Sequence, residues 1–457
     1  MKNFEILPTE ENLILTLKKN LLSRNKDLVR FYELISLQED NCSIALDGRW
    51  GSGKTFFVKQ SVLMINANNP VSDMDDDTRI QITRALNLQK REKDASESFD
   101  VAVYYDAWEN DNDIDPILSI VYEIVKQLGI NYSFKDNDAF MQAGSILEVI
   151  TNRNITGMIE NLKSSDPLKK IKEEKDLQEK IKAFFTELLE ERGNRLIVFI
   201  DELDRCKPSY SVQLLERIKH YLSDGRITFV FSVNLSELQH TIRRYYGNMF
   251  DASRYLDRFF NLRISLPPAD KTAFYSELGL DSGYVVEEVC QRIIDTYNMG
   301  LREICRFYRQ VKTAEYKPTH DSKKFNFYDS ERNTKLFLLM YIVPVLIGLK
   351  IVNISLYDEF VSGRDSSPLI DVYKNSYIGE RLACELLNQN ESLEVTVDKK
   401  LVTLEQKLKE LYKAIFVNDG TYDINGKKLG DYIFRNSSKR FIRDVESMLS
   451  LYADYSI

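Results

Sequence analysis

The segment Gly48–Thr55 restricts the fold of this chain more than any other part of its sequence. It reads GRWGSGKT and fills every fixed position of the pattern G-x-x-x-x-G-K-[ST]. The apolar stretch CSIAL precedes it, and TFFVKQSVLMI, which has helical spacing, follows it. Such glycines let successive backbone N–H groups turn toward one anion, and a helix that begins near Lys54 adds the positive end of its dipole. The segment therefore predicts a strand, a phosphate-binding loop and a helix.

This loop predicts a nucleoside triphosphate as the ligand. Lys54 would reach the β and γ phosphates, and the Thr55 hydroxyl would bind Mg²⁺. The alternative is a glycine-rich turn that only joins a strand to a helix, and the filled pattern in its strand–helix context disfavours it. The residues predicted to hold the nucleotide are Gly48, Arg49, Trp50, Gly51, Ser52, Gly53, Lys54, Thr55 and Phe56.

A nucleotide site of this kind also needs a strand that ends in a carboxylate, and RLIVFIDELDR at 195–205 is the best candidate. Asp201 would bind Mg²⁺ through water, and Glu202 would orient and deprotonate the attacking water. The alternative is an acid pair at a solvated strand end or at a helix N-cap. We expect the catalytic role because the phosphate-binding loop is in the same chain.

The next apolar run, ITFVFSV at 227–233, predicts another buried strand and is followed by Asn234. In P-loop ATPases with an additional strand, a polar residue at this strand tip senses the γ-phosphate and positions water. Asn234 occupies that place. It could instead, or in addition, cap the helix predicted at LSELQHTIRRYY.

Four motifs together resemble the KAP family of P-loop NTPases, in the STAND-like and AAA-related branch. They are ALDGRWGSGKT, VAVYYDAWEND, LIVFIDELDRCKP and YLDRFFNLRISLP, and the resemblance covers about residues 20 to 315. The sequence departs from the family pattern in two ways. Many members have a pair of transmembrane helices in this domain, and no such pair is predicted between Phe56 and Phe99, which indicates a soluble branch. In addition, Asp106 stands where Asn is common in the strand motif. The resemblance implies a role in bacterial defence against phage or foreign DNA, beside a separate effector protein.

The motif VAVYYDAWEND predicts a strand whose tip carries Asp106, Trp108 and Glu109. In one interpretation Trp108 packs in a core and Glu109 caps the following helix, DPILSIVYEIVKQL. In the other, Asp106 or Glu109 orients the nucleophilic water or contacts a neighbouring subunit. The residues alone do not choose between these interpretations.

Arginines are expected at the site because charge on the transferred phosphoryl group is usually stabilised by a guanidinium. The segment ASRYLDRFFNLRISLPP offers Arg254, Arg258 and Arg263, and Arg258 stands at the family position before the last core strand. In related ATPases this region supplies an arginine to the adjacent protomer, which implies a homo-oligomer. Arg302, in NMGLREICRFYRQVK, resembles the sensor arginine of the family's helical lid. Each could instead be an ordinary surface arginine.

The fold class that follows is α/β: a P-loop NTPase parallel sheet of about five strands flanked by helices, then a helical lid and an all-α C-terminal domain. The strands are predicted near 42–46, 101–105, 196–200, 227–233 and 262–266. The domains are predicted as a helical lead-in at 1–40, the core at 41–268 with a helical insertion at about 130–194, the lid at 269–315 and the C-terminal domain at 328–457.

Composition limits the partners and the compartment. The net charge of -8 gives no global attraction to nucleic acid, so nucleic acid is possible but not indicated. Five cysteines without a CxxC pair, and a start without a secretory signal, favour a reduced, cytoplasmic protein. The uncharged stretch Leu336–Leu349 is shorter than the roughly 20 residues that span a bilayer, so we expect a buried helix and no transmembrane segment.

We therefore expect an ATP- and Mg²⁺-dependent NTPase that acts as a nucleotide-driven switch or assembly component. Lys54, Thr55, Asp201 and Glu202 would carry the chemistry. One alternative is a scaffold whose assembly depends on ATP binding while hydrolysis is slow. Another is a motor that acts on DNA, which the acidic charge balance disfavours.

Overall fold

The structure is a computed structural model, and it divides the chain into two compact units, Ile6–Ala273 and Phe274–Ile457, which we describe separately. The residues that it describes are 7–38, 42–88, 99–129, 167–221, 225–281, 283–320, 330–395, 399–417 and 426–447.

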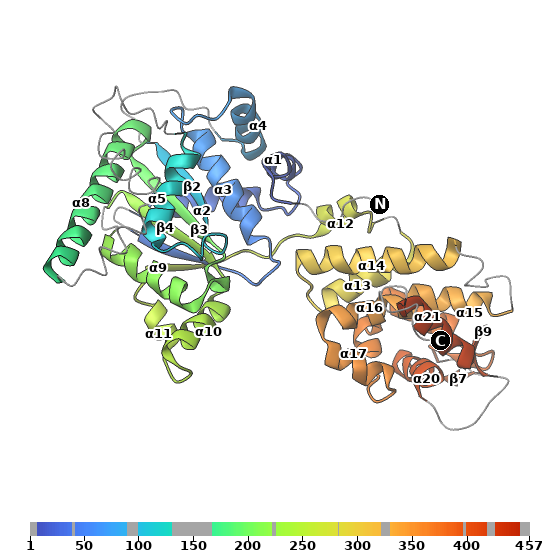
Figure 1. The fold of residues 1–457 in the computed structure, drawn as a ribbon. Coiled ribbons are helices and arrows are strands. Elements are labelled where there is room, and N and C mark those ends of the chain that lie inside the picture. The colour runs from blue at the N-terminus through green and yellow to red at the C-terminus, as the bar shows by residue number, and fades with distance from the viewer. Residues whose placement is uncertain are drawn as a thin grey trace. The chain divides into compact units, whose positions relative to one another are not determined.

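The first unit contains a five-stranded sheet with the order β2-β3-β4-β1-β5, in which all neighbouring strands are parallel (Figure 1). Its strands are β1 (Cys42–Asp47), β2 (Asp100–Asp106), β3 (Arg195–Asp201), β4 (Ile227–Val233) and β5 (Leu262–Ser265). The predicted α/β fold with a parallel sheet is confirmed. Because β1 lies between β4 and β5, the segment that follows β1 leaves from the interior of the sheet.

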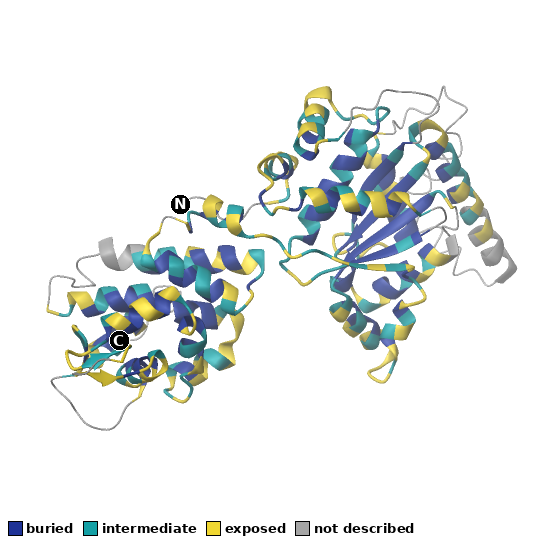
Figure 2. Ribbon diagram, turned by 180° about the vertical axis from the view of Figure 1, so that it is seen from behind, coloured by how far each residue is buried: buried dark blue, intermediate teal, exposed yellow. Residues whose placement is uncertain are grey.

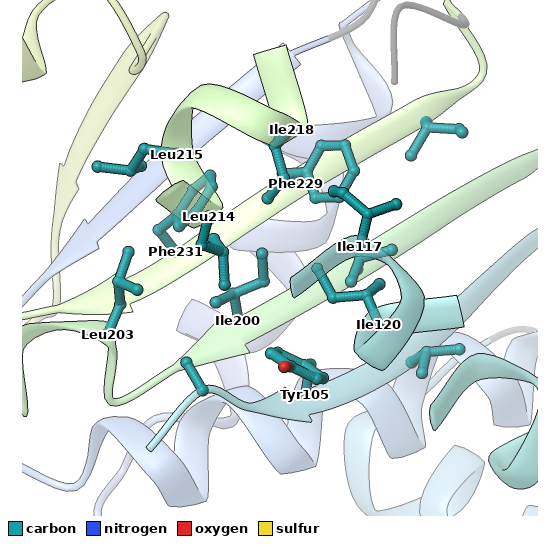
Figure 3. Packing of buried hydrophobic residues seen from close by; sticks show 14 of the residues in the cluster. Tyr105, Ile117, Ile120, Ile200, Leu203, Leu214, Leu215, Ile218, Phe229 and Phe231 are labelled. Carbon is teal, nitrogen blue, oxygen red and sulfur yellow. The ribbon is translucent and has the colours of Figure 1, made fainter. Parts of the chain in front are cut away.

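Helices cover both faces of this sheet. Those in the first unit are α1 (Glu10–Lys19), α2 (Asn25–Ser36), α3 (Lys54–Asn68), α4 (Asp76–Leu86), α5 (Pro116–Gln127), α8 (Pro167–Arg192), α9 (Pro208–Tyr221), α10 (Leu235–Tyr246) and α11 (Ala252–Leu256). Successive strand residues point to opposite faces, so Ile197 packs with the core of α1 to α4, whereas Val198 packs with that of α5, α8 and α9. Figure 3 shows the second core, where Ile117 and Ile218 pack near Phe229.

The helix α8 is the described part of the predicted insertion at 130–194; residues 130–166 lie outside the described residues. Ile181, Phe184 and Leu188 are buried in the core, as expected for one apolar face. Leu177, four residues before Ile181, has the helical spacing of the same face, but its side chain lies outside the described residues. The helix ends before Gly193, where an added Cβ would lie 2.6 Å from the Phe99 carbonyl oxygen. Only glycine therefore lets the backbone at this position pass so close to the residue before β2.

The second unit is mostly helical. Its helices are α13 (Val285–Thr296), α14 (Leu301–His320), α15 (Arg332–Phe337), α16 (Val343–Val352), α17 (Ile354–Val361), α18 (Ser367–Tyr373), α19 (Tyr377–Glu385), α20 (Leu404–Phe416) and α21 (Asn436–Ser447), and α12 (Thr272–Leu278) lies across the boundary between the units. Two short two-stranded sheets, β6 (Glu391–Ser392) with β7 (Lys400–Leu401) and β8 (Lys427–Leu429) with β9 (Tyr432–Phe434), add to an otherwise helical C-terminal region. The helices α13 and α14, predicted as a lid, contact α16 and belong to this unit.

Among the described residues, one helical segment, Arg332–Val352, has the length and the apolar composition of a membrane-spanning helix. However, 67% of its most apolar 18-residue stretch is buried inside the fold; Figure 2 shows burial along the chain. It includes a π-helical turn, η3 (Leu338–Ile342), just before Pro344. Proline lacks an N–H and its ring clashes with the carbonyl one turn earlier, and the wider turn relieves that conflict. The burial pattern is that of the core helix expected from the sequence.

Candidate functional site

The predicted phosphate-binding loop lies between β1 and α3, and α3 begins at Lys54 as expected. The Gly48 N–H donates to the Val233 carbonyl at 3.1 Å, which fixes the start of the loop beside the end of β4. Gly51 and Gly53 have φ angles of 75° and 88°, in the left-handed region where glycine carries no steric penalty. The loop therefore has the backbone conformation that an anion-binding concavity requires.

The Lys54 side chain crosses this loop and is 8% exposed. Its Nζ donates to the Gly48 carbonyl at 2.5 Å and to the Arg49 carbonyl at 3.2 Å. Burial lowers the pKa of Lys54, and the nearby carboxylates of Asp204 and Asp201 oppose that change. The site thus holds a cation whose present partners are backbone carbonyls, which phosphate oxygens can replace.

Asp201 ends β3 and is fully buried. The Glu202 N–H donates to its Oδ1 at 3.0 Å, and the Tyr104 hydroxyl lies 3.3 Å from its Oδ2. Tyr104 is also 3.4 Å from the Oδ2 of Asp106, which pairs with Asp201 across the two strands. Burial raises the pKa of Asp201, and the neighbouring hydroxyl groups of Ser232 and Thr55 oppose that change. Thr55 and Asp201, predicted as the metal ligands, are therefore brought together.

These two side chains fit a magnesium ion. Both offer hard oxygen donors, and the Asp201 carboxylate is buried, which disfavours its charge unless a cation is near. Among the described residues no group of three or more His, Cys, Asp or Glu side chains could hold a metal by itself. An ion at Thr55 and Asp201 would take its other ligands from water and phosphate, which is the usual arrangement for Mg²⁺.

Glu202 has a left-handed backbone, with φ 60° and ψ 23°, and leads into the short turn η2 (Leu203–Arg205). Its Oε2 lies 2.6 Å from Nε of Arg205. Burial, followed by the charge of Asp201, raises the pKa of Glu202 to about 7, although Arg205 opposes this. A carboxylate with a pKa near neutrality is suited to accept a proton from water.

The Arg205 guanidinium lies near two tryptophan rings. Its guanidinium carbon is 5.6 Å from the Trp50 ring centroid and 5.5 Å from that of Trp108, within the range of cation–π attraction. The Trp50 Nε1 also donates to Oδ2 of Asp204 at 2.7 Å. This group of side chains attaches the phosphate-binding loop to the turn that carries Glu202.

The first interpretation of the strand-tip motif is wrong in both parts. Trp108 is 53% exposed and therefore is not a core residue. The side chain of Asp115, and not Glu109, caps α5 by accepting from the N–H groups of Ile117 and Leu118. Asp106 stabilises its own turn, because its Oδ1 accepts from the N–H groups of Trp108 and Glu109.

Asn234 lies at the N-cap position of α10, but its side chain makes no capping hydrogen bond. The Leu235 N–H donates instead to Oδ1 of Asp47, at the end of β1. Capping by Asn234 is therefore not the arrangement in the structure. Because Val233 contacts Gly48, Asn234 lies beside the start of the phosphate-binding loop.

The candidate arginines differ in their surroundings. Arg254 and Arg258 are exposed, whereas Arg263 forms an ion pair with Asp257. Arg302 is exposed on α14 in the other compact unit. The roles predicted for Arg258 and Arg302 stay predictions.

Three residues at the site were missed in the sequence reasoning. Tyr104 is part of the motif VAVYYDAWEND, and its place before the strand tip could have drawn attention to it. Arg205 stands three residues after Glu202 in RLIVFIDELDR, and that spacing could have suggested the ion pair between them. Arg24 donates from NH1 to the Ser52 carbonyl at 2.9 Å, and nothing in its local sequence signals that contact.

The sequence matches the model of a known protein family. The family model described as KAP family P-loop domain matches residues 24–317, which is well over half of the chain. No curated protein matches the sequence. The match begins at the helical lead-in, includes the whole sheet and ends within α14.

Proposed function

The chain belongs to the KAP family of P-loop proteins, whose domain supports nucleotide binding, and on that premise we propose that it hydrolyses Mg²⁺-ATP as a nucleotide-driven switch or assembly component. One observation carries the proposal. A cationic Lys54, a buried Asp201 and a Glu202 with a near-neutral pKa are gathered at the carboxyl edge of one parallel sheet. Ligand sites in open α/β sheets lie at this edge.

Each side chain has a role in the proposed reaction. Lys54 exchanges its carbonyl partners for oxygens of the β and γ phosphates, and the loop N–H groups hold the same phosphates. Glu202 accepts a proton from the attacking water, and Asn234 orients that water against the γ-phosphate. A magnesium ion held by Thr55 and Asp201, when bound, supplies charge neutralisation to the phosphates.

Two arginines complete the proposal. Arg258 is exposed and without an ion-pair partner among the described residues, so it is free to reach the nucleotide of an adjacent protomer. Arg302 would respond to the nucleotide from the helices that follow the sheet. Both roles need the guanidinium to act on phosphoryl charge, and the first needs a homo-oligomer.

The cellular role is proposed from the family resemblance and not from a residue of the site. It is cytoplasmic defence against phage or foreign DNA, in which nucleotide-dependent assembly acts together with a separate effector protein. The helical C-terminal region is the part of the chain that would contact such a partner.

The experiment compares the wild type with Glu202→Gln in an assay of Mg²⁺-ATP hydrolysis, with mass photometry on the same samples with and without ATP. We expect the wild type to turn over and Glu202→Gln to bind ATP without turnover and to accumulate in a larger species. Lys54→Ala serves as the binding-deficient control, because it removes the cation of the loop. A wild type that neither binds nor hydrolyses ATP would refute the proposal.

A second candidate is a scaffold whose assembly needs ATP binding while hydrolysis is slow. The observation in its favour is the 2.6 Å contact between Glu202 and Arg205, which occupies the carboxylate that hydrolysis requires. In that case the wild type and Glu202→Gln would form the same ATP-dependent assembly, and Arg205→Gln would accelerate hydrolysis. ATPase activity that DNA strongly stimulates, with salt-sensitive binding, would instead indicate a motor acting on DNA.

A further inference from the structure

We infer that Arg24 is a positioning residue that holds the Ser52–Gly53 peptide with its N–H directed at the bound phosphates. This inference rests on the proposed nucleotide site and adds to it a residue from the helical lead-in, outside the phosphate-binding motif.

The contacts of Arg24 carry the argument. Its NH1 donates to the Ser52 carbonyl at 2.9 Å and its NH2 donates to the Pro267 carbonyl at 2.5 Å. No cis peptide is present among the described residues, so the Ser52 C=O and the Gly53 N–H point in opposite directions across one planar unit. A donor that holds this carbonyl therefore directs the Gly53 N–H away from Arg24.

The loop needs such a restraint because of its glycines. Gly51 and Gly53 flank Ser52 and both have left-handed φ angles, and glycine adopts other conformations at little cost. Rotation of the Ser52–Gly53 peptide would turn its carbonyl oxygen toward the phosphates in place of the N–H. A hydrogen bond from a fixed guanidinium to that carbonyl opposes the rotation.

Arg24 itself is firmly held. It is 5% exposed, and it lies at the N-terminus of α2, where the Leu28 N–H donates to its carbonyl at 3.0 Å. Pro267 follows β5, and the adjacent Leu266 N–H donates to the Asp47 carbonyl of β1 at 2.7 Å. The second bond therefore connects Arg24 to the strand that neighbours the loop-bearing strand, so the guanidinium cannot easily follow a rotating loop.

The charge of Arg24 acts in the same direction. Burial lowers the pKa of Arg24 to about 10, while Asp27 opposes this, so the side chain stays cationic near neutral pH. The two atoms that accept hydrogen bonds from its guanidinium are backbone carbonyl oxygens, and neither belongs to a carboxylate. A buried cation at the carbonyl end of the Ser52–Gly53 peptide polarises that peptide. The N–H at its other end then attracts the phosphates more strongly.

The test measures the dissociation constants of Mg²⁺-ATP and Mg²⁺-ADP for the full-length wild type, Arg24→Gln and Arg24→Lys. Arg195→Gln is a matched control, because Arg195 also donates to two backbone carbonyls, those of Ile35 and Gln38. Arg195 stands at the start of β3, so it lies at the amino ends of the strands, away from the phosphate-binding loop at their carboxyl ends. Thermal unfolding of each variant shows how much general stability is lost.

Arg24→Gln should raise both dissociation constants by about tenfold or more, the usual effect of losing a hydrogen bond to a charged group. Arg24→Lys should restore part of the affinity, because it keeps the charge but not the two-pronged geometry. Arg195→Gln should leave the affinities within about twofold. If Arg24→Gln does not fold, an unchanged affinity in Arg24→Lys refutes the inference by itself.

Two other results would overturn the inference. In one, Arg24→Gln binds both nucleotides as the wild type does. In the other, Arg24→Gln and Arg195→Gln lose affinity equally and in proportion to their loss of stability, which would show a general structural role. A wild type that does not bind Mg²⁺-ATP refutes the proposed function itself and the inference with it, and is thus distinguished from these two results.

Discussion

Replacing Glu202 with Gln should remove activity and yet stabilise the folded NTPase unit at alkaline pH. Burial, followed by repulsion from Asp201, raises the pKa of Glu202 from its ordinary value of 4.5 to about 7. When folding raises the pKa of a carboxyl group, the protonated group contributes its full stability below the pKa that it has in the unfolded chain. That contribution is lost as the pH rises through the pKa that the group has in the folded protein. Glutamine carries no charge and does not undergo this loss.

The size of the effect follows from the shift. A change from 4.5 to about 7 corresponds to roughly 3 kcal/mol if the whole shift were expressed in stability. The Glu202 side chain is 16% exposed and paired with Arg205, so solvent screening and the lost ion pair reduce the expected gain to about 1–2 kcal/mol. For a unit of this size, that gain raises the unfolding temperature by roughly 2–8 °C.

The assay is thermal unfolding of the wild type and Glu202→Gln at pH 5 and pH 8, in EDTA and without nucleotide. The two proteins should unfold at similar temperatures at pH 5, and Glu202→Gln should unfold at a higher temperature at pH 8. Glu109→Gln is the control, because Glu109 is an exposed acid on a nearby turn and its replacement changes the net charge equally. In the hydrolysis assay, Glu202→Gln should lose about 10²–10⁴-fold in rate.

The reasoning would be refuted if Glu202→Gln were destabilised by the same amount at both pH values. That result would mean that the ion pair with Arg205 contributes more than the desolvation of the carboxylate costs. It would also remove the argument that Glu202 is poised near neutral pH.

Three further predictions concern other parts of the chain. Lys54→Ala should weaken Mg²⁺-ATP binding by about tenfold or more, measured by titration, because the loop loses its cation. Gly193→Ala should lower the stability of the first unit by about 1–3 kcal/mol in urea unfolding, because its Cβ would lie 2.6 Å from the Phe99 carbonyl oxygen. Lys407→Met should destabilise the second unit by about 1–3 kcal/mol in urea unfolding, because the buried Lys407 ammonium pairs with Glu391 and with the more exposed Glu410, which water can solvate after the change; Lys409→Met, at an exposed pair, should cost much less.

Much of the site could be predicted because its signals are local. The pattern Gly48–Thr55 and the acids after β3 each occupy a few consecutive residues, and their order between apolar strands follows from the spacing of buried side chains. In a parallel sheet, loops that follow the strands meet at one edge. The sequence was therefore enough to predict that Lys54, Asp201 and Glu202 lie together.

The assignment of α13 and α14 shows where local reasoning reaches its limit. Their amphipathic sequences predicted helices in the region 269–315, and both helices form. An amphipathic face indicates that a helix is covered but does not indicate by what. Only the packing decided that these helices contact α16, in the compact unit that begins at Phe274.

The sequence by itself determined the strand, loop and helix around Lys54, the carboxylates after β3 and the parallel α/β fold. The tertiary structure decided which distant side chains restrain that site: Trp50 bonds to Asp204, 154 residues away, and Tyr104 lies beside Asp201, 97 residues away. Periodicity and motif spacing report on neighbours within a turn or a strand, whereas these contacts depend on how the helices and strands pack. A hydrogen bond between residues so far apart leaves no repeated pattern in the chain, and so it appears only when the fold is known.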